Sequence, residues 1–517
     1  MASTFKDLPN NTASSWWKDP SLRRNVATAI ICYFGSYSLG YDGSYLNGLQ
    51  SLTTWQTYWD HPRGTRLGLI SAMSYLPALA IMPVYPIICD YGGRRFSAML
   101  GCLILFAGAI LGGLATNEGM LLGGRALVGI AGSFLSLACN LLCNEILHPR
   151  LRSVGSAFFL VFYYTGSATS AWISYGVIRG GWASEWSWRL PTIVQAAGPC
   201  IVFFGSFFID ESPRFLMARG KREKALKVLA RQHANGKEND PLVVHEMQEI
   251  EAALEREKRE KLGFLSFLKT PGNRRRLLIV ALTGTGTQAT GITVFSYYLA
   301  PALRLAGVTN PSVQTGVNGG LALFNLVLAG VGASLVERVG RRKLWLISTV
   351  GMLFSYTILI GLSGGFASTQ DKNTGLATIA FIFLTYGFYD IAWTPLAYSY
   401  TTEILPYSLR ASGMALFIFG QKGSLAACQW INPIGLDAIG WKYYFVFFAT
   451  LILYSVMLYL FFPETRGLSL EEVAMIFDDA NEASNLQDRK EAVDAQVKFD
   501  RQLEHREFSG ADSAKSA

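Results

Sequence analysis

Apolar segments of membrane-crossing length recur along the chain, separated by short polar loops. A helix that crosses the hydrocarbon core of a bilayer needs about 20 mostly apolar residues. The polar stretch 210–274 is too charged to span, so it predicts amphipathic helices on the membrane surface. The sequence therefore predicts an all-α membrane protein with twelve transmembrane helices. They are expected at residues 26–48, 67–89, 96–115, 120–146, 152–175, 190–209, 275–303, 311–336, 344–365, 375–402, 411–433 and 441–462.

The composition agrees with a membrane protein. Hydrophobic residues make up 50% and charged residues 16% of the 517 residues, whereas soluble domains carry about 25% charged residues. The net charge of +8 comes from basic clusters between apolar segments, a pattern that orients membrane proteins and does not indicate nucleic-acid binding. The seven cysteines lie in or beside apolar segments, which favours buried free thiols over disulfides or a zinc site. The polar first 25 residues indicate no cleavable signal peptide.

The distribution of lysine and arginine predicts the orientation. Loops on one side of the predicted bundle are rich in basic residues, and the opposite loops are poorer. Because basic loops stay in the cytoplasm, the termini (1–25 and 463–517) and the middle segment 210–274 are expected there. The basic residues concerned are Arg94, Arg95, Arg150, Arg152, Arg338, Arg341, Arg342, Lys343 and Arg410.

The two halves of the chain repeat each other. "DYGGRR" returns as "ERVGRR", "EILHPRLR" returns as "EILPYSLR", and "DESPRFL" returns as "PETRGLSL". The repeat is about 250 residues long, which is too long for a solenoid unit. Two duplicated six-helix bundles, residues 26–209 and 275–462, are typical of an alternating-access transporter.

These motifs, in this order and spacing, resemble the sugar porter family of the major facilitator superfamily. Further markers are "GYDG", "GRALVGIAGS" and "PETRGLSLEE", while "WSWRLPTIVQ" and "FSYYL" resemble the fungal lactose and cellodextrin permease branch. The resemblance implies the major facilitator fold and transport of a mono- or disaccharide by alternating access. It also implies proton symport, with a sugar and a proton as partners.

Charged residues in the loop motifs that the two halves share have two interpretations. In the family, such charges form a network at the inner mouth that stabilises the outward-open state. The simpler alternative is that they only orient the protein, although orientation does not require the carboxylates. The residues expected in this gate network are Arg94, Arg95, Glu145, Arg152, Glu337, Arg341, Arg342, Glu403 and Arg410.

Asp42 lies in a predicted membrane helix, where a charge costs several kcal/mol unless it is paired or faces water. Arg125 lies in the fourth predicted helix. In proton-coupled sugar porters the matching aspartate and arginine form the coupling pair, because a carboxylate that loses its cation takes up a proton. The alternative is a static structural ion pair.

Sugar recognition needs neutral hydrogen-bonding groups and aromatic faces. The resemblance places such groups on the seventh, eighth, tenth and eleventh helices. Each could instead only pack or hold helices together. The sequence departs from the family at Thr287, in place of a glutamine, Thr293, in place of an asparagine, and Tyr398, in place of a tryptophan. Leu160 replaces another glutamine, whose loss Tyr163 and Tyr164 would partly compensate. The expected substrate-binding residues are Gln288, Thr293, Tyr297, Tyr298, Asn325, Trp393, Tyr398 and Gln421.

Lys422 and Asp390 add two charges at membrane depth, which is unusual. One hypothesis is that they pair across the tenth and eleventh helices. Another is that Lys422 binds a carboxylate substrate such as a sugar acid. A third is that Lys422 extends along its helix to reach water.

The leading hypothesis is a plasma-membrane sugar:proton symporter that functions as a monomer in the lipid bilayer. The alternatives are a carrier of a polyol, sugar acid, quinate-like acid or secondary metabolite, and a non-transporting sugar sensor. An enzyme is disfavoured because the sequence has no phosphate loop, zinc spacing or nucleophile motif, and the five histidines are scattered. No cofactor, metal or nucleic-acid partner is expected.

Overall fold

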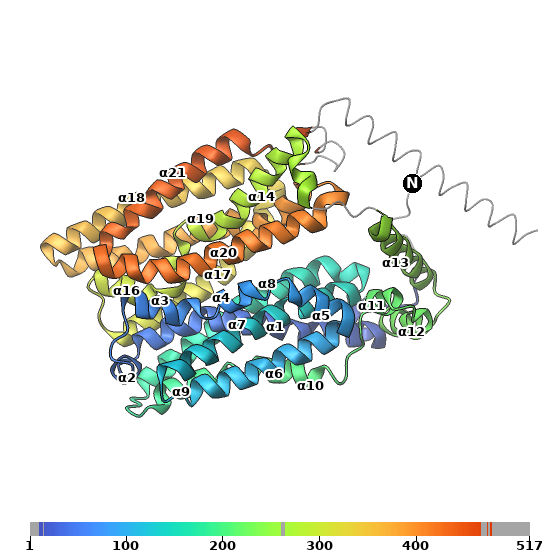
Figure 1. Cartoon of the computed structure of the whole chain (residues 1–517), viewed down its shortest axis with the longest axis horizontal. Helices are drawn as coiled ribbons and strands as arrows, with labels where there is room; N and C mark the ends of the chain where they lie inside the picture. Colours follow the sequence, from blue (N-terminus) through green and yellow to red (C-terminus); the bar gives the residue numbers. More distant parts are fainter. Residues whose placement is uncertain (1–9, 14, 260–263, 467–472, 474–475, 478–517) are drawn as a thin grey trace, which may run out of the picture.

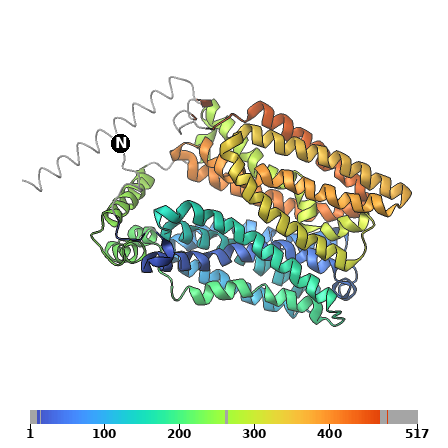
Figure 2. The same cartoon turned by 180° about the vertical axis from the view of Figure 1, so that it is seen from behind.

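The computed structural model describes residues 10–13, 15–259, 264–466, 473 and 476–477. These residues form helices and loops, with no strand among them. Figure 1 shows two layers of roughly parallel helices, one built from α1–α10 and the other from α14–α21, and Figure 2 shows them from behind. We call these layers the first and second bundles. The linker helices α11–α13 lie at one end of the bundles, here called the linker end.

The first bundle begins with a 32-residue helix, α1 (Pro20–Ser51). The short 3-10 helix η2 (Trp16–Lys18) precedes it. The remaining helices are α2 (Thr53–Tyr58), α3 (Gly64–Ala72), α4 (Leu76–Ala80), α5 (Val84–Gly92), α6 (Arg94–Gly113), α7 (Glu118–Ile146), α8 (Pro149–Arg179), α9 (Trp186–Val194) and α10 (Ala197–Gly205).

The second bundle follows the 3-10 helix η3 (Phe264–Leu268). Its helices are α14 (Pro271–Ala289), α15 (Ile292–Tyr297), α16 (Leu299–Leu305), α17 (Pro311–Val339), α18 (Arg341–Thr369), α19 (Lys372–Ile404), α20 (Tyr407–Ile439), η4 (Gly440–Tyr443) and α21 (Tyr444–Phe461). The linker helices are α11 (Pro213–Ala218), α12 (Arg222–His233) and α13 (Pro241–Arg259). They bury a small apolar core of their own, which includes Leu229 and Met247.

Six helical segments of the described chain are long and apolar enough to cross a membrane. Three expected spans are instead broken into shorter helices in series. Residues 67–89 form α3, α4 and α5, residues 190–209 form α9 and α10, and residues 275–303 form α14, α15 and α16. The six segments are Arg94–Gly113, Glu118–Ile146, Pro311–Gly332, Arg341–Thr369, Lys372–Ile404 and Ser412–Phe461.

The breaks in residues 67–89 and 275–303 have local causes. Pro77 lies in the first turn of α4 and Pro83 immediately precedes α5, and proline cannot donate a hydrogen bond within a helix. Gly291 separates α14 from α15 with a φ of 90°, a conformation that other residues rarely adopt. The Gly291 carbonyl accepts a hydrogen bond from the hydroxyl of Tyr356 at 2.8 Å, which fixes the turn.

Small residues let α1 and α8 cross at close range. A Cβ atom on Gly40 would lie 1.8 Å from the carbonyl oxygen of Tyr163, and one on Gly166 would lie 2.0 Å from that of Tyr37. Each helix therefore presents a glycine to the backbone of the other. Such packing is a usual way to associate helices in a membrane.

Hydrogen bonds join the two bundles at the end opposite the linker helices. The Asn47 side chain donates to the Ser296 carbonyl and accepts from the backbone N–H of Leu299. Gln50 donates to the Tyr297 carbonyl at 3.0 Å. The start of α1 instead contacts the linker helices, because Ser21 donates to the Arg231 carbonyl of α12 at 2.8 Å. The pocket described below lies between these two ends.

Candidate functional site

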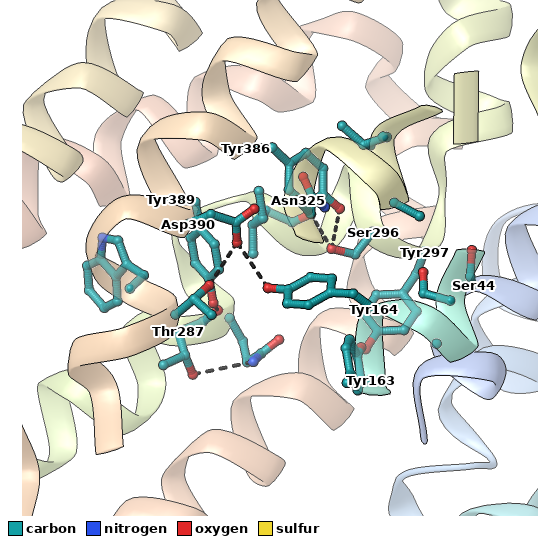
Figure 3. Close-up of a pocket in the computed structure, with 18 of the residues that line it drawn as sticks. Ser44, Tyr163, Tyr164, Thr287, Ser296, Tyr297, Asn325, Tyr386, Tyr389 and Asp390 are labelled. Carbon is teal, nitrogen blue, oxygen red and sulfur yellow. Dashed lines mark hydrogen bonds between the residues drawn. The ribbon is translucent and has the colours of Figure 1, made fainter. Parts of the chain in front are cut away.

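A cavity of about 230 Å³ lies between the bundles. Figure 3 shows that the labelled side chains converge on it from both. This volume is smaller than the roughly 300–1,000 Å³ of pockets for drug-sized ligands, so it fits a small solute. Its polar lining residues are Ser44, Tyr163, Tyr164, Ser167, Thr287, Gln288, Ser296, Tyr297, Asn318, Asn325, Tyr386, Tyr389, Asp390, Trp393, Thr394, Tyr398 and Gln421.

Asp390 is the carboxylate in the pocket wall, and it is 1% exposed. It accepts hydrogen bonds from the hydroxyls of Tyr164 at 3.2 Å and Thr394 at 2.8 Å. With its amide nitrogen assigned to the side that faces acceptors, Asn325 also donates to Asp390 Oδ2 at 3.2 Å. The carboxylate is thus held by one residue of the first bundle, Tyr164, whose bond Figure 3 shows, and by two of the second.

Six of the eight substrate-binding residues expected from the sequence line this cavity. Tyr398 donates to the side-chain oxygen of Gln421 at 2.9 Å, which orients the amide. Trp393 is 1% exposed and donates to the Thr349 hydroxyl at 3.2 Å, so its ring supports the wall from behind. The six are Gln288, Tyr297, Asn325, Trp393, Tyr398 and Gln421.

Thr293 and Tyr298 lie outside the pocket wall, although the sequence analysis expected both to bind substrate. Thr293 donates to the Gln288 carbonyl and accepts from the Asn432 side chain at 3.0 Å. The Tyr298 hydroxyl donates to Gln429. The break at Gly291 restarts the helix in a new direction, so Tyr297 faces the cavity while Tyr298 points into the second bundle.

The sequence analysis missed several polar residues of the pocket. The Ser296 and Tyr386 hydroxyls lie 2.6 Å apart, Tyr389 donates to the Thr287 carbonyl at 2.8 Å, and Asn318 donates to Ser44 across the bundles. A tyrosine or serine in an apolar helix is usually packing or surface. For Tyr386 the signal is its place four residues before Asp390 in the same helix, because residues three or four apart share one helix face. The other missed residues are adjacent to Asp390 or lie on other helices, so the sequence carries no such signal for them.

The hypothesis that Asp390 pairs with Lys422 is wrong for this structure. Asp390 is held by hydroxyl and amide groups as described above. Lys422 forms no hydrogen bond or ion pair with another described residue. The two residues lie on different helices, α19 and α20, and Lys422 is not part of the pocket wall.

Asp42 and Arg125 form an ion pair of 2.6 Å between Oδ1 and Nη1. The Arg125 side chain is 5% exposed and the Asp42 side chain is 14% exposed. Arg125 Nε also donates to the Ile70 carbonyl at 3.4 Å, and its guanidinium lies 5.7 Å from the centre of the Tyr45 ring. The sequence therefore correctly anticipates the pairing, whereas the role of the pair in proton coupling stays a prediction.

The predicted gate residues form matching pairs at the linker end. Arg94 contacts Glu145 with both Nε and Nη2, at 3.0 and 3.2 Å. Arg341 contacts Glu403 at 3.1 Å in the second bundle. Each of these pairs stays within its own bundle.

Two glutamates that the sequence analysis left unassigned complete the pattern. Glu211 accepts from the backbone N–H groups of Arg94 and Arg95 at the start of α6. Glu464 does the same for Arg341 and Arg342 at the start of α18. A carboxylate is stabilised at a helix N-terminus by the free N–H groups there. Burial raises the pKa of the Glu211 carboxyl.

Arg152 does not pair with Glu145, its neighbour in the predicted gate network. It lies 3.7 Å from Glu246 of the linker helix α13, while Glu145 is engaged by Arg94. Arg410 lies in the first turn of α20. The side chain of Glu337 lies outside the described residues.

Comparison with known proteins agrees with this architecture. The family model described as "Sugar (and other) transporter" matches residues 28–477. The MFS-type transporter criB of Aspergillus cristatus is 28% identical over 461 residues, covering 88% of this chain and 93% of that protein. A quinate permease of Neurospora terricola is 28% identical over 523 residues, covering 94% of each chain.

The inward open conformation of the xylose transporter XylE from E. coli superimposes on the structure with a TM-score of 0.72 at 20% identity, covering 88% of this chain and 100% of that one. The two bundles and the pocket between them have the fold of that transporter. By its match to the family model, this chain belongs to the Sugar (and other) transporter family.

Proposed function

We propose that this protein carries a neutral, hydroxyl-rich solute of sugar size across a membrane by alternating access, together with a proton. The observation that carries the proposal is the pocket itself. It lies between the bundles, is small, and is lined by hydroxyl and amide groups with tyrosine rings beside them. Such groups match the donors, acceptors and apolar faces of a sugar.

Individual side chains have assignable roles in this proposal. Gln288, Asn325 and Gln421 supply amides that both donate and accept, so they suit sugar hydroxyls. Tyr297 of α15 and Tyr398 of α19 supply ring faces to the pocket wall. Asp390 accepts hydrogen bonds and would fix one hydroxyl more strongly than a neutral group does.

Proton coupling is proposed for Asp42 and Arg125. The two side chains are nearly buried and lie 2.6 Å apart, so separation of Asp42 from Arg125 would leave the Asp42 carboxylate in a poorly hydrated site. Such a group takes up a proton. Proton binding is thereby linked to a change of structure, and a proton gradient drives accumulation.

A carboxylate substrate is the second candidate, because one relative is a quinate permease. The described pocket wall argues against it. The wall contains Asp390 and no lysine, arginine or histidine. A carboxylate substrate would therefore enter a buried site without a compensating cation, which is costly.

The linker helices and both termini are proposed to lie in the cytoplasm. Four arginines of the loop motifs lie at the linker end: Arg94, Arg95, Arg341 and Arg342. Loops rich in basic residues stay in the cytoplasm, so this end is assigned to the cytoplasmic side. The plasma membrane is the proposed location, with transport and not catalysis as the activity.

Uptake into proteoliposomes tests the proposal. Labelled sugars, polyols and sugar acids are offered with and without an inward proton gradient. We expect accumulation of a neutral sugar that requires the gradient, and we expect Asp42→Asn to abolish accumulation while exchange of substrate persists. Gradient-driven accumulation by Asp42→Asn would refute the coupling assignment, and transport of acids alone would refute the substrate class.

A further inference from the structure

The guanidinium of Arg125 is held by two acceptors on different helices. Its Nη1 lies 2.6 Å from Asp42 Oδ1 of α1, and its Nε donates to the Ile70 carbonyl of α3 at 3.4 Å. The Arg125 side chain is buried, so little water is available to replace either acceptor. A movement of Ile70 therefore changes the distance between Arg125 and Asp42.

The C-terminal end of α3 is fixed to α7. The Ser74 hydroxyl donates to the Arg125 carbonyl at 3.3 Å. The Ser74 backbone also lies directly on α7, because a Cβ atom on Gly129 would lie 1.7 Å from the Ser74 carbonyl oxygen. Residues 73–75 separate α3 from α4, and Ile70 lies about one helical turn before Ser74. A tilt of α3 about Ser74 therefore displaces the Ile70 carbonyl without breaking a regular helix.

The body of α3 packs closely on α20 of the second bundle. A Cβ atom on Gly68 would lie 2.7 Å from the Trp430 carbonyl oxygen, and one on Gly64 would lie 2.8 Å from Asp437 Oδ2. The two glycines thus let α3 lie directly against α20. Because α3 is fixed to the first bundle at Ser74 and supported by the second at Gly68, its tilt depends on how the two bundles are placed.

Other titratable or charged groups surround Asp42, but Arg125 is the cation that contacts it among the described residues. The tyrosines are neutral below about pH 10 and cannot replace the guanidinium. Lys422 forms no hydrogen bond or ion pair with another described residue. The groups within electrostatic reach of Asp42 are Tyr45 of α1, Tyr75 between α3 and α4, Arg125 of α7, Tyr163 of α8, Tyr297 of α15 and Lys422 of α20.

We propose that Gly68 is a positioning residue of the coupling pair, through which the distance between Arg125 and Asp42 depends on the position of the second bundle. The inference rests on the proton coupling proposed above. As the bundles part at this end, α20 withdraws from Gly68 and α3 tilts about Ser74. The Ile70 carbonyl moves with α3.

The tilt acts on proton binding through the Ile70 carbonyl. The Nε of Arg125 follows its acceptor, because a buried donor without an acceptor is costly. The guanidinium thereby moves away from Asp42, and the carboxylate binds a proton more readily as its cation recedes. When the bundles close again, the ion pair re-forms and the proton is released. The pair thus separates, as the proposed coupling requires, although both residues belong to the first bundle.

Pulsed EPR tests this inference without a solute. Spin labels at Phe96 and Lys343, exposed positions near the starts of α6 and α18, report the distance between the bundles. The population ratio of the two arrangements is measured in nanodiscs between about pH 5 and about pH 8. Proton binding at Asp42 favours the parted arrangement, so the wild-type ratio should change by up to about tenfold per pH unit. Asp42→Asn is expected to remove this response.

Gly68→Ala is the variant that tests the positioning role. Its methyl group would lie 2.7 Å from the Trp430 carbonyl oxygen, so α3 is displaced from α20 in both arrangements. We expect the pH response to fall by about 2- to 30-fold, whereas a merely structural change would shift the ratio equally at every pH. Gly361→Ala is the matched control and should keep the wild-type response, because a Cβ atom at this exposed position of α18 meets nothing within 4 Å.

The outcomes separate this inference from the proposed function. If Asp42→Asn keeps the wild-type response, proton coupling at Asp42 itself fails. If Asp42→Asn loses the response but Gly68→Ala keeps it, only the inference about Gly68 fails. Equal losses in Gly68→Ala and Gly361→Ala also overturn it. Should Gly68→Ala not fold, Arg125→Lys decides the question, because lysine retains the charge but lacks the Nε that binds the Ile70 carbonyl. A full pH response in that variant would overturn the inference.

Discussion

Tyr164 of the first bundle donates a hydrogen bond of 3.2 Å to Asp390 of the second, in the wall of the pocket. The bonds through Asn47 and Gln50 lie farther toward the end opposite the linker helices. The Tyr164 contact and the bond from Asn318 to Ser44 are therefore the cross-bundle contacts that a substrate in the pocket meets directly.

Tyr164→Phe is expected to weaken the conformation seen here. A buried hydrogen bond contributes about 0.5–1.5 kcal/mol, so the population of this conformation relative to others should fall by about 2- to 13-fold. Pulsed EPR measures this with spin labels at Phe96 and Lys343, exposed equivalent positions near the starts of α6 and α18. We expect a new distance population in the variant.

Tyr389→Phe is the matched control for this change. Its hydroxyl donates to the Thr287 carbonyl within the second bundle at 2.8 Å, and its ring lines the same pocket. The same atom is deleted, but no contact between the bundles is lost. Equal distance distributions for both variants would show that the Tyr164 bond does not hold the bundles.

The membrane-crossing character of the chain follows from hydropathy, but the breaks within three spans do not. A 20-residue apolar window averages over Pro77, Pro83 and Gly291, each of which interrupts a helix locally. Whether a glycine breaks a helix depends on tertiary contacts such as the Tyr356 bond to the Gly291 carbonyl. Periodicity along the sequence carries no information about that contact.

The Asp42–Arg125 pair could be predicted because two opposite charges in apolar helices have few other solutions. The tyrosine and serine lining could not, since hydroxyl groups cost little in either location. Tyr298 is the opposite case, a residue that was predicted to line the pocket but does not. It neighbours a pocket residue in sequence, yet the turn at Gly291 directs its hydroxyl to Gln429.

Arg125→Gln alone is expected to destabilise the protein more than Arg125→Gln combined with Asp42→Asn does. Removing Arg125 leaves the carboxylate buried without its cation, which costs about 3–5 kcal/mol. Adding Asp42→Asn removes the charge and should restore most of that loss. Thermal unfolding of the single and double variants in detergent measures this coupling. Additive losses would mean that the pair contributes nothing as a pair.

Glu145→Gln is expected to cost more stability than Glu403→Gln, although the two residues occupy equivalent places. The Glu145 side chain is 12% exposed and that of Glu403 is 25% exposed. Water screens the second pair more, so we expect losses of about 3 and about 1 kcal/mol, respectively. Chemical unfolding of both variants provides the measurement. A larger loss for Glu403→Gln would contradict the burial argument.

His148 makes the stability of the linker end depend on pH. It is 1% exposed at the start of α8, where its Nδ1 accepts from the backbone N–H of Arg150 at 3.2 Å. Burial lowers its pKa to about 3, and neighbouring His233 and Arg150 act in the same direction.

An exposed histidine titrates near pH 6.5, so the unfolded chain binds an additional proton between about pH 6.5 and pH 3. Stability must therefore fall as the pH falls through this window, by about 2 kcal/mol from pH 7 to pH 5. His148→Asn removes the titration and keeps a side chain that caps a helix well. Thermal unfolding at pH 7 and pH 5 should show a smaller acid-induced loss in the variant than in the wild type. Equal losses would mean that other groups cause the acid sensitivity.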